Sequence, residues 1–146
     1  MPVILKRAYE KPSRSDGTRV LVDRLWPRGL TKEAAELDAW LKDVAPSNDL
    51  RRWFHARPAL WLAFRKKYLG ELAAPAASQA LKKLYQLAGK SRRLTLVFSA
   101  RNQEQNNAVV LKQLLEGMRK PPSTSGPKGA AATSARAARA RAPRRR

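Results

Sequence analysis

The chain has 146 residues, with 31 Lys and Arg against 11 Asp and Glu and a formal net charge of +20. This length predicts one compact domain with a sizeable core. No apolar run reaches the roughly 18 residues that a membrane helix needs, so we expect no membrane partner. The absence of cysteine excludes disulfides and thiol catalysis. Residues 1–5 do not resemble a secretion signal, so we expect a cytoplasmic protein.

The positive charge is divided between two parts of the chain. Residues 1–119 hold 23 Lys and Arg and 11 Asp and Glu, whereas residues 120–146 hold 8 Lys and Arg and no acid. The second part is rich in Ala, Arg and Pro, with almost nothing to bury. We therefore expect a domain at 1–119 and a disordered basic tail at 120–146.

Two short apolar runs at residues 3–5 and 20–22 predict strands, the second of them buried on both faces. Residues 10–18 have the composition of a loop. Residues 26–29, with the sequence WPRG, fit a type I turn, and Thr31 fits the cap of a helix that begins at Lys32. This helix is expected to span about a dozen residues, because apolar side chains recur at helical spacing at Leu37, Trp40, Leu41 and Val44.

Further helices and one strong strand complete the expected domain. Ser47 fits the cap of a helix with Leu50, Trp53 and Phe54 on its apolar face. Later helices are expected at 58–72, at 78–88 after a linker, and at 104–118, and the strand at 94–98. Two strand-to-helix units predict an α/β fold, with a small, mostly parallel sheet flanked by helices.

Charged residues follow two of the predicted strands. Asp23, Arg24 and Arg28 come after the strand at 20–22, and Arg101 comes after the strand at 94–98. If the two strands are parallel neighbours, these arginines meet at the carboxyl end of the sheet, where open α/β folds bind ligands. Arginine binds phosphate or carboxylate through two donors at once. The alternative is structural, with Asp23 accepting turn N–H groups or pairing with an arginine.

The other candidate residues each have a structural alternative. Asp23 and His55, the only histidine, are the candidates for acid–base chemistry, although His55 also fits a residue at a helix end. Trp26 could stack on a ring of the ligand or pack in the core. Ser47 fits a helix cap better than a nucleophile. Asn106 fits a ligand contact and a helix cap equally well. Lys42 and Arg51 fit ligand contacts or solvent-exposed positions. No metal site or cofactor is expected, since one histidine without cysteine or clustered carboxylates supplies too few ligands.

Several motifs resemble the YeaO-like family, also known as domain of unknown function 488. The resemblance covers about residues 1–118 and rests on VDRLWPRG at 22–29, WLKD at 40–43, APS at 45–47, WFH at 53–55, FSAR at 98–101 and NNAVVL at 106–111. It implies a small soluble bacterial α/β protein with no established activity. The family often has histidine before the Asn pair, where this chain has Gln105.

Three functions remain open from the sequence. The first is binding of a small anionic ligand, with or without catalysis, at the carboxyl end of the sheet. The second is non-specific association of the basic tail at 120–146 with nucleic acid, through its phosphates. The third is a structural or interaction domain without catalysis.

Overall fold

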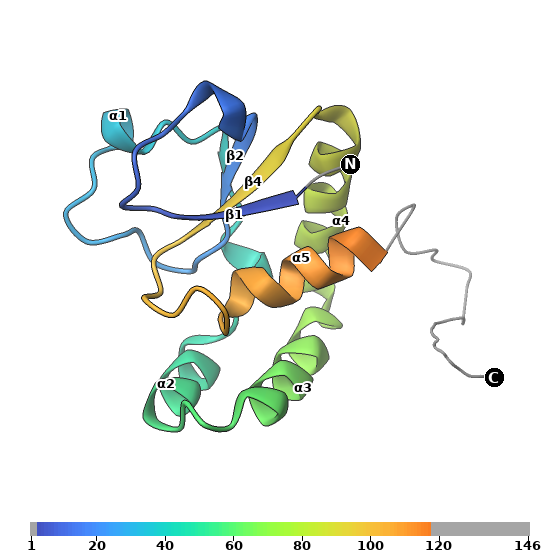
Figure 1. Cartoon of the computed structure of the whole chain (residues 1–146). Helices are drawn as coiled ribbons and strands as arrows, with labels where there is room; N and C mark the ends of the chain where they lie inside the picture. Colours follow the sequence, from blue (N-terminus) through green and yellow to red (C-terminus); the bar gives the residue numbers. More distant parts are fainter. Residues whose placement is uncertain (1–2, 118–146) are drawn as a thin grey trace.

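A four-stranded parallel sheet organises residues 3–117, the part of the chain that the computed structural model describes (Figure 1). The strands lie in the order β1-β4-β2-β3 and span Val3–Arg7 (β1), Thr18–Leu21 (β2), Ala39–Trp40 (β3) and Leu94–Phe98 (β4). Every neighbouring pair is parallel. All four strands therefore end at one edge of the sheet, which we call the carboxyl edge, and the predicted α/β class is confirmed.

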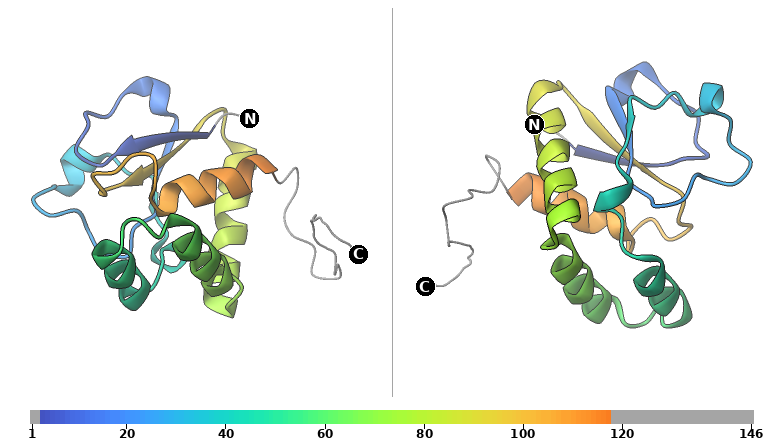
Figure 2. Two further views of the ribbon diagram at one scale, coloured as in Figure 1. Left: turned by 60° about the horizontal axis from the view of Figure 1, so that its bottom comes forward. Right: turned by 180° about the vertical axis from the view of Figure 1, so that it is seen from behind.

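The longer helices pack together against one face of the sheet (Figures 1 and 2). The α-helices are α1 (Lys32–Ala35), α2 (Asn48–Ala56), α3 (Trp61–Leu72), α4 (Pro75–Lys90) and α5 (Asn107–Gly117), and the 3-10 helices are η1 (Arg14–Asp16) and η2 (Lys42–Val44). Side chains of β2 and β4 alternate between the faces, so Val20, Leu96 and Phe98 pack into the main core with Tyr68 and Leu111.

Loops cover the opposite face of the sheet. Here Ala8, Leu21 and Val97 are buried beneath the two segments that flank β2. The partly buried residues packed on this small core are Trp26, Leu30, Leu37 and Trp40. The β2 strand is therefore buried on both faces, as its apolar sequence predicts, although only one face is covered by long helices.

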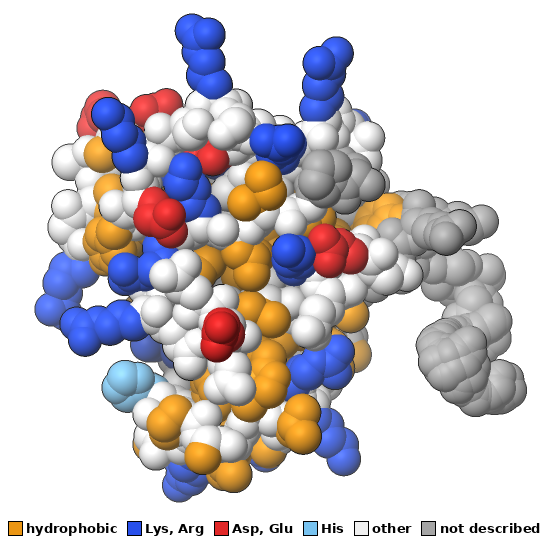
Figure 3. Space-filling view, in the orientation of Figure 1, with side chains coloured by type: hydrophobic (Ala, Val, Ile, Leu, Met, Phe, Trp, Pro, Cys, Tyr) orange, Lys and Arg blue, Asp and Glu red, His pale blue; other side chains and the backbone are white. Residues whose placement is uncertain are grey.

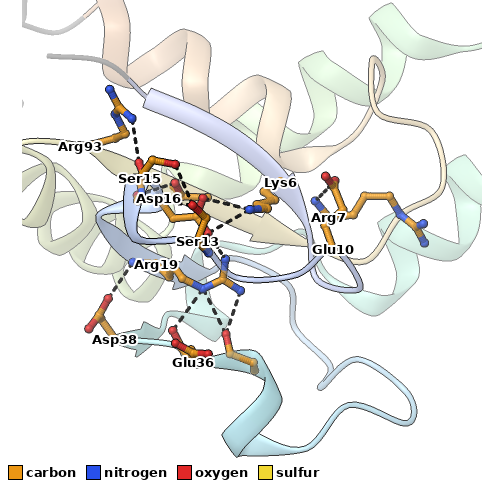
Figure 4. A network of polar contacts seen from close by, with 12 residues as sticks. Lys6, Arg7, Glu10, Ser13, Ser15, Asp16, Arg19, Glu36, Asp38 and Arg93 are labelled. Atoms are coloured by element: carbon orange, nitrogen blue, oxygen red, sulfur yellow. Dashed lines mark hydrogen bonds and ion pairs between the residues drawn. The ribbon is translucent and has the colours of Figure 1, made fainter.

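A buried ionic network fixes the loops on this second face (Figure 4). The carboxylate of Asp16 accepts hydrogen bonds from the Arg19 guanidinium at 2.7 Å and from Lys6 Nζ at 3.1 and 3.2 Å. Burial raises the pKa of Asp16, but the hydrogen bonds from Ser13 N, Lys6 and Arg19 outweigh it and hold the pKa below its ordinary value. We did not expect this network from the sequence.

The expected helix at 32–44 is wrong after its first turn. Helix α1 ends at Ala35, Glu36 adopts a left-handed conformation with φ of 46°, and Ala39–Trp40 forms an edge strand beside β2. At this break the guanidinium of Arg19 in β2 donates hydrogen bonds to Ala35 O at 2.8 and 3.1 Å and to Glu36 O at 3.2 Å. A tertiary contact therefore overrides the helical spacing of the apolar residues.

The expected type I turn at 26–29 is also wrong, because the turn lies one residue later in the chain. The hydrogen bond runs from Leu30 N to Pro27 O, and Gly29 occupies the third position of the turn with φ of 77°. A positive φ at that position favours glycine and is typical of a type II turn.

Helix boundaries shift by a few residues elsewhere. Helix α3 begins at Trp61 rather than 58, and α4 begins at Pro75, where a proline at the first position needs no N–H partner. The caps predicted at Thr31 and Ser47 are confirmed, each side chain accepting a hydrogen bond from the third helical N–H. The expected tail at 120–146 lies outside the described residues and stays a prediction.

Candidate functional site

Asp23 joins the ends of two neighbouring strands at the carboxyl edge. Its Oδ2 accepts hydrogen bonds from Ser99 N at 2.8 Å and from Ser99 Oγ at 2.7 Å. Asn107 Nδ2 donates to Val22 O at 2.9 Å and to Asp23 Oδ1 at 3.3 Å. The segment after β2, the segment after β4 and the start of α5 are thereby held together.

The carboxylate of Asp23 has an unusual electrostatic environment. Burial raises its pKa above the ordinary value, and this effect exceeds the opposite effects of the Ser99 and Asn107 hydrogen bonds and of the Arg51 charge. Among residues 3–117, no cation lies close enough to form an ion pair with it. Neutral donors therefore satisfy this carboxylate, and they come from the segment after β4 and the start of α5, not from the turn that follows β2.

Arg24 directs its guanidinium toward the backbone. It donates from Nε to Pro46 O at 3.2 Å and from Nη2 to Ala45 O at 3.0 Å, while Nη1 lies 4.0 Å from the Asp43 carboxylate. These contacts hold the segment between η2 and α2 against the end of β2. Two of its donor positions are thus used within the fold.

Three other arginines extend into solvent near this edge. The side chains of Arg28, Arg51 and Arg101 are exposed and make no hydrogen bond or ion pair with the residues that the structure describes. Figure 3 shows Lys and Arg side chains along the left edge of the molecule, over the turn after β2 and the loop after β4. These three residues, which we call the edge arginines, are the free cations of the predicted site.

Arg7, at the end of β1, connects the segment after β4 with the segment after β2 through Tyr9. Its guanidinium donates to Ala100 O at 3.0 Å and to Ser99 O at 3.2 Å, and it lies 5.3 Å from the centre of the Tyr9 ring. The Tyr9 hydroxyl in turn donates to Arg28 O at 3.0 Å. A continuous chain of contacts therefore connects the backbone of Arg28 with the loop that carries Arg101.

Ser47 and Asn106 cap helices in the structure. The Ser47 hydroxyl accepts from Leu50 N and donates to Glu71 Oε2 at 2.6 Å, while Ser47 N donates to Glu71 Oε1 at 2.8 Å. Asn106 is buried, and its Oδ1 accepts from Val109 N at 3.0 Å. Both side chains are therefore committed to helix ends.

The contacts that Trp26, Lys42 and His55 make with other described residues do not involve the edge arginines. Trp26 packs edge-on against Trp40, with ring centres 5.4 Å apart, and its Nε1 donates to Leu30 O. The Lys42 ammonium lies 4.2 Å from the centre of the Trp40 ring. His55 is exposed in the last turn of α2 and is the pale-blue side chain in Figure 3.

Ser99 and Glu71 are two polar residues near this edge that were not expected from the sequence. Ser99 directly follows β4 as Asp23 closely follows β2, so the strand-end argument applied to Arg101 would have found it. Glu71 has no comparable signal, since it lies on α3 and meets Ser47 only in the folded chain. Residues 3–117 contain no cluster of three His, Asp or Glu side chains that could hold a metal ion.

The family relationship follows from the sequence comparison. The profile of the family described as "Inactive DUF488-N3 subclade" matches residues 2–133. The chain belongs to this DUF488 subclade. In accord with the YeaO-like motifs, it is 44% identical over 118 residues to "Uncharacterized protein YeaO" of Escherichia coli K12, which covers 81% of this chain and all of that protein.

Mycobacterial proteins show a similar relationship to this DUF488 chain. "Uncharacterized protein Mb3100c" of Mycobacterium bovis and "Uncharacterized protein Rv3073c" of Mycobacterium tuberculosis are each 43% identical over 115 residues, 79% of this chain and 94% of theirs. No solved structure matches significantly. Within the described part of this DUF488 protein, no helix has the length and apolar character to cross a membrane.

Proposed function

We propose that this domain binds a small phosphate- or carboxylate-bearing ligand at the carboxyl edge of the sheet, without catalysing a reaction. The observation that carries the proposal is the hydrogen-bonded junction between Asp23 and Ser99. This junction holds the loop of Arg101 next to the segment that leads to Arg28, and the charge of Arg51 acts on the same carboxylate. Arg28 and Arg101 thus lie on segments that meet at this junction, and Arg51 is close enough for its charge to act on the Asp23 carboxylate.

The chemistry of the edge arginines supports an anionic ligand. Guanidinium groups bind phosphate and carboxylate through paired hydrogen bonds, and a surface of one sign attracts ligands of the opposite sign. The ordinary partner of a surface arginine is a carboxylate, as for Arg52 with Asp49 at 2.9 Å on the same helix as Arg51. The edge arginines have no such partner among residues 3–117 and keep their donors available.

The available acid–base groups support binding rather than catalysis. His55 projects from α2 without a hydrogen-bond partner among the described residues, and Asp23 is occupied by Ser99 and Asn107. Gln105 stands where the family often has histidine, and its backbone N–H donates to Asn102 Oδ1. The description of the subclade as inactive agrees with this interpretation.

Thermal unfolding with pyrophosphate tests the proposal. A ligand that binds only the folded state stabilises it by about 2.7 kcal/mol at one hundred times its Kd, which raises Tm by several degrees. We expect this rise for the wild type and a smaller rise for Arg51→Ala and Arg101→Ala. Arg52→Ala removes the same charge from the neighbouring position of α2 and should keep the full rise.

The Tm of each variant without pyrophosphate serves as the reference, so a structural role of an arginine is separated from a ligand effect. No rise in the wild type, or an equal rise in all four proteins, would contradict the proposal.

A further inference from the structure

A groove lies at the outer side of β3, between η2 and the first turns of α4. It has a volume of about 640 Å³, within the range of small-molecule sites. The lining combines apolar, aromatic and polar residues, among them Trp40, Lys42, Asp43, Gln79 and Lys83. None of the edge arginines lines it, so this groove is separate from the site proposed above.

Trp40 lines the groove from the loop-covered side of β3, and its indole is held in a fixed position. Trp40 Nε1 donates to Asp23 O at 2.6 Å, and its ring packs edge-on against Trp26. The backbone of Trp40 pairs with β2 beside Leu21. The indole is therefore placed before any ligand arrives, so little conformational freedom is lost when one binds.

A flexible cation lies over this ring. The Lys42 ammonium is 4.2 Å from the ring centre, at an exposed position where such an interaction is weak. A flat ring stacks on an indole at least as favourably, and the four-carbon stem of Lys42 allows its ammonium to move aside. A ligand ring can therefore take the place of the Lys42 ammonium on the Trp40 ring at little energetic cost.

The charges around the groove define the rest of the ligand. Lys83 is exposed on α4 and makes no hydrogen bond or ion pair with residues 3–117. Gln79 lies one turn earlier on the same helix and adds an amide donor, whereas the Asp43 carboxylate lies toward Arg24, at 4.0 Å. An anionic group is therefore favoured near Lys42 and Lys83 and disfavoured near Asp43.

We propose that this groove binds a small molecule that carries a flat apolar ring and one anionic group. The ring stacks on Trp40 in place of the Lys42 ammonium. The anionic group lies between Lys42 and Lys83, where two ammonium groups and the Gln79 amide donate to it.

Titration of the ¹⁵N-labelled full chain with 1-naphthyl phosphate tests this inference by NMR. We expect saturable shifts of the Trp40 indole N–H and of the Gln79 and Lys83 amides, with a Kd below about 1 mM. 1-Naphthol lacks the anion and inorganic phosphate lacks the ring, so each should bind the groove at least tenfold more weakly. These two comparisons show that both parts of the ligand are recognised.

Charge reversal on α4 supplies matched variants. Lys83→Glu should weaken binding of 1-naphthyl phosphate at least tenfold, whereas Lys82→Glu, which makes the same change beside the groove, should leave the Kd within twofold. Arg101→Ala should also leave these shifts unchanged, so failure of the edge site and failure of the groove are distinguishable. Equal weakening by Lys82→Glu and Lys83→Glu, or shifts confined to residues 99–107, would overturn the inference.

Discussion

Arg19 illustrates how a charged side chain becomes part of the interior of this fold. It is 3% exposed, bonds the Asp16 carboxylate, and donates to the carbonyls that end α1. Removing one partner of a buried ion pair leaves an uncompensated charge and unsatisfied acceptors. The stability of the loop-covered face of the sheet should therefore depend strongly on this residue.

Replacement of Arg19 tests this dependence. We expect Arg19→Met to lower the free energy of unfolding by about 3–5 kcal/mol, measured by urea denaturation. Arg52→Met breaks the exposed pair with Asp49 and should have little effect, because exposed pairs contribute little. A loss of unfolding free energy for Arg19→Met as small as that for Arg52→Met would show that the buried network does not stabilise the fold.

Asp23 gives the folded state a pH dependence of defined sign. Its pKa is raised above the ordinary 3.8, so the folded chain binds this proton more tightly than the unfolded chain. The contribution of Asp23 to the free energy of unfolding therefore falls as pH rises from 3.8 through the raised pKa. Relative to Asp23→Asn, the wild type should lose stability over this interval and then reach a plateau.

Urea denaturation at a series of pH values measures this difference. If the wild type instead gained stability relative to Asp23→Asn with rising pH, the Arg51 charge and the Ser99 hydrogen bonds would outweigh burial.

At the scale of elements, Glu71 connects α3 to the start of α2. Both of its carboxylate oxygens accept from Ser47, which itself caps α2. Glu71→Ala leaves a partly buried N–H without its partner, and we expect a loss of about 1–3 kcal/mol in the free energy of unfolding. Glu116→Ala on the exposed face of α5 is the control, and an equal loss there would contradict a specific role for the Ser47 contact.

The elements that could be predicted from sequence are those with a strong local signal. The apolar run at Leu94–Phe98 indicates a buried strand, and Ser47 before an amphipathic stretch indicates a helix start; both are present. β3 could not be predicted because Ala39 and Trp40 join the sheet through β2, after Arg19 has ended α1. The spacing of apolar residues along the chain carries no information about that contact with Arg19.

In the candidate site, too, one part could be predicted from the sequence and another could not. The topology confirms that β2 and β4 are parallel neighbours, the condition on which the meeting of their carboxyl ends depended. The directions of the side chains could not be predicted: Arg24 turns back to the carbonyls of Ala45 and Pro46, while Arg28 and Arg101 extend outward. Which carbonyls need a donor is known only once the backbone has folded.

At the scale of the whole molecule, the charge of residues 120–146 predicts salt-dependent binding of nucleic acid. These residues carry eight Lys and Arg, and neutralising that many phosphates on duplex DNA gives a log–log slope of about −7 between affinity and salt concentration. We expect fluorescence anisotropy to show this slope for the full chain and much weaker binding for residues 1–119. Undiminished binding after the truncation would assign the affinity to the folded domain.

The most direct test of anion binding at the carboxyl edge is NMR of the arginine Nε–Hε groups during titration with pyrophosphate. We expect saturable shifts for the edge arginines Arg28, Arg51 and Arg101, because their guanidinium groups exchange water for the ligand. The signal of Arg24 should move less, since its Nε already donates to Pro46 O, and that of Arg52 should stay unchanged. Uniform small shifts across all arginines, or none, would contradict a site at this edge.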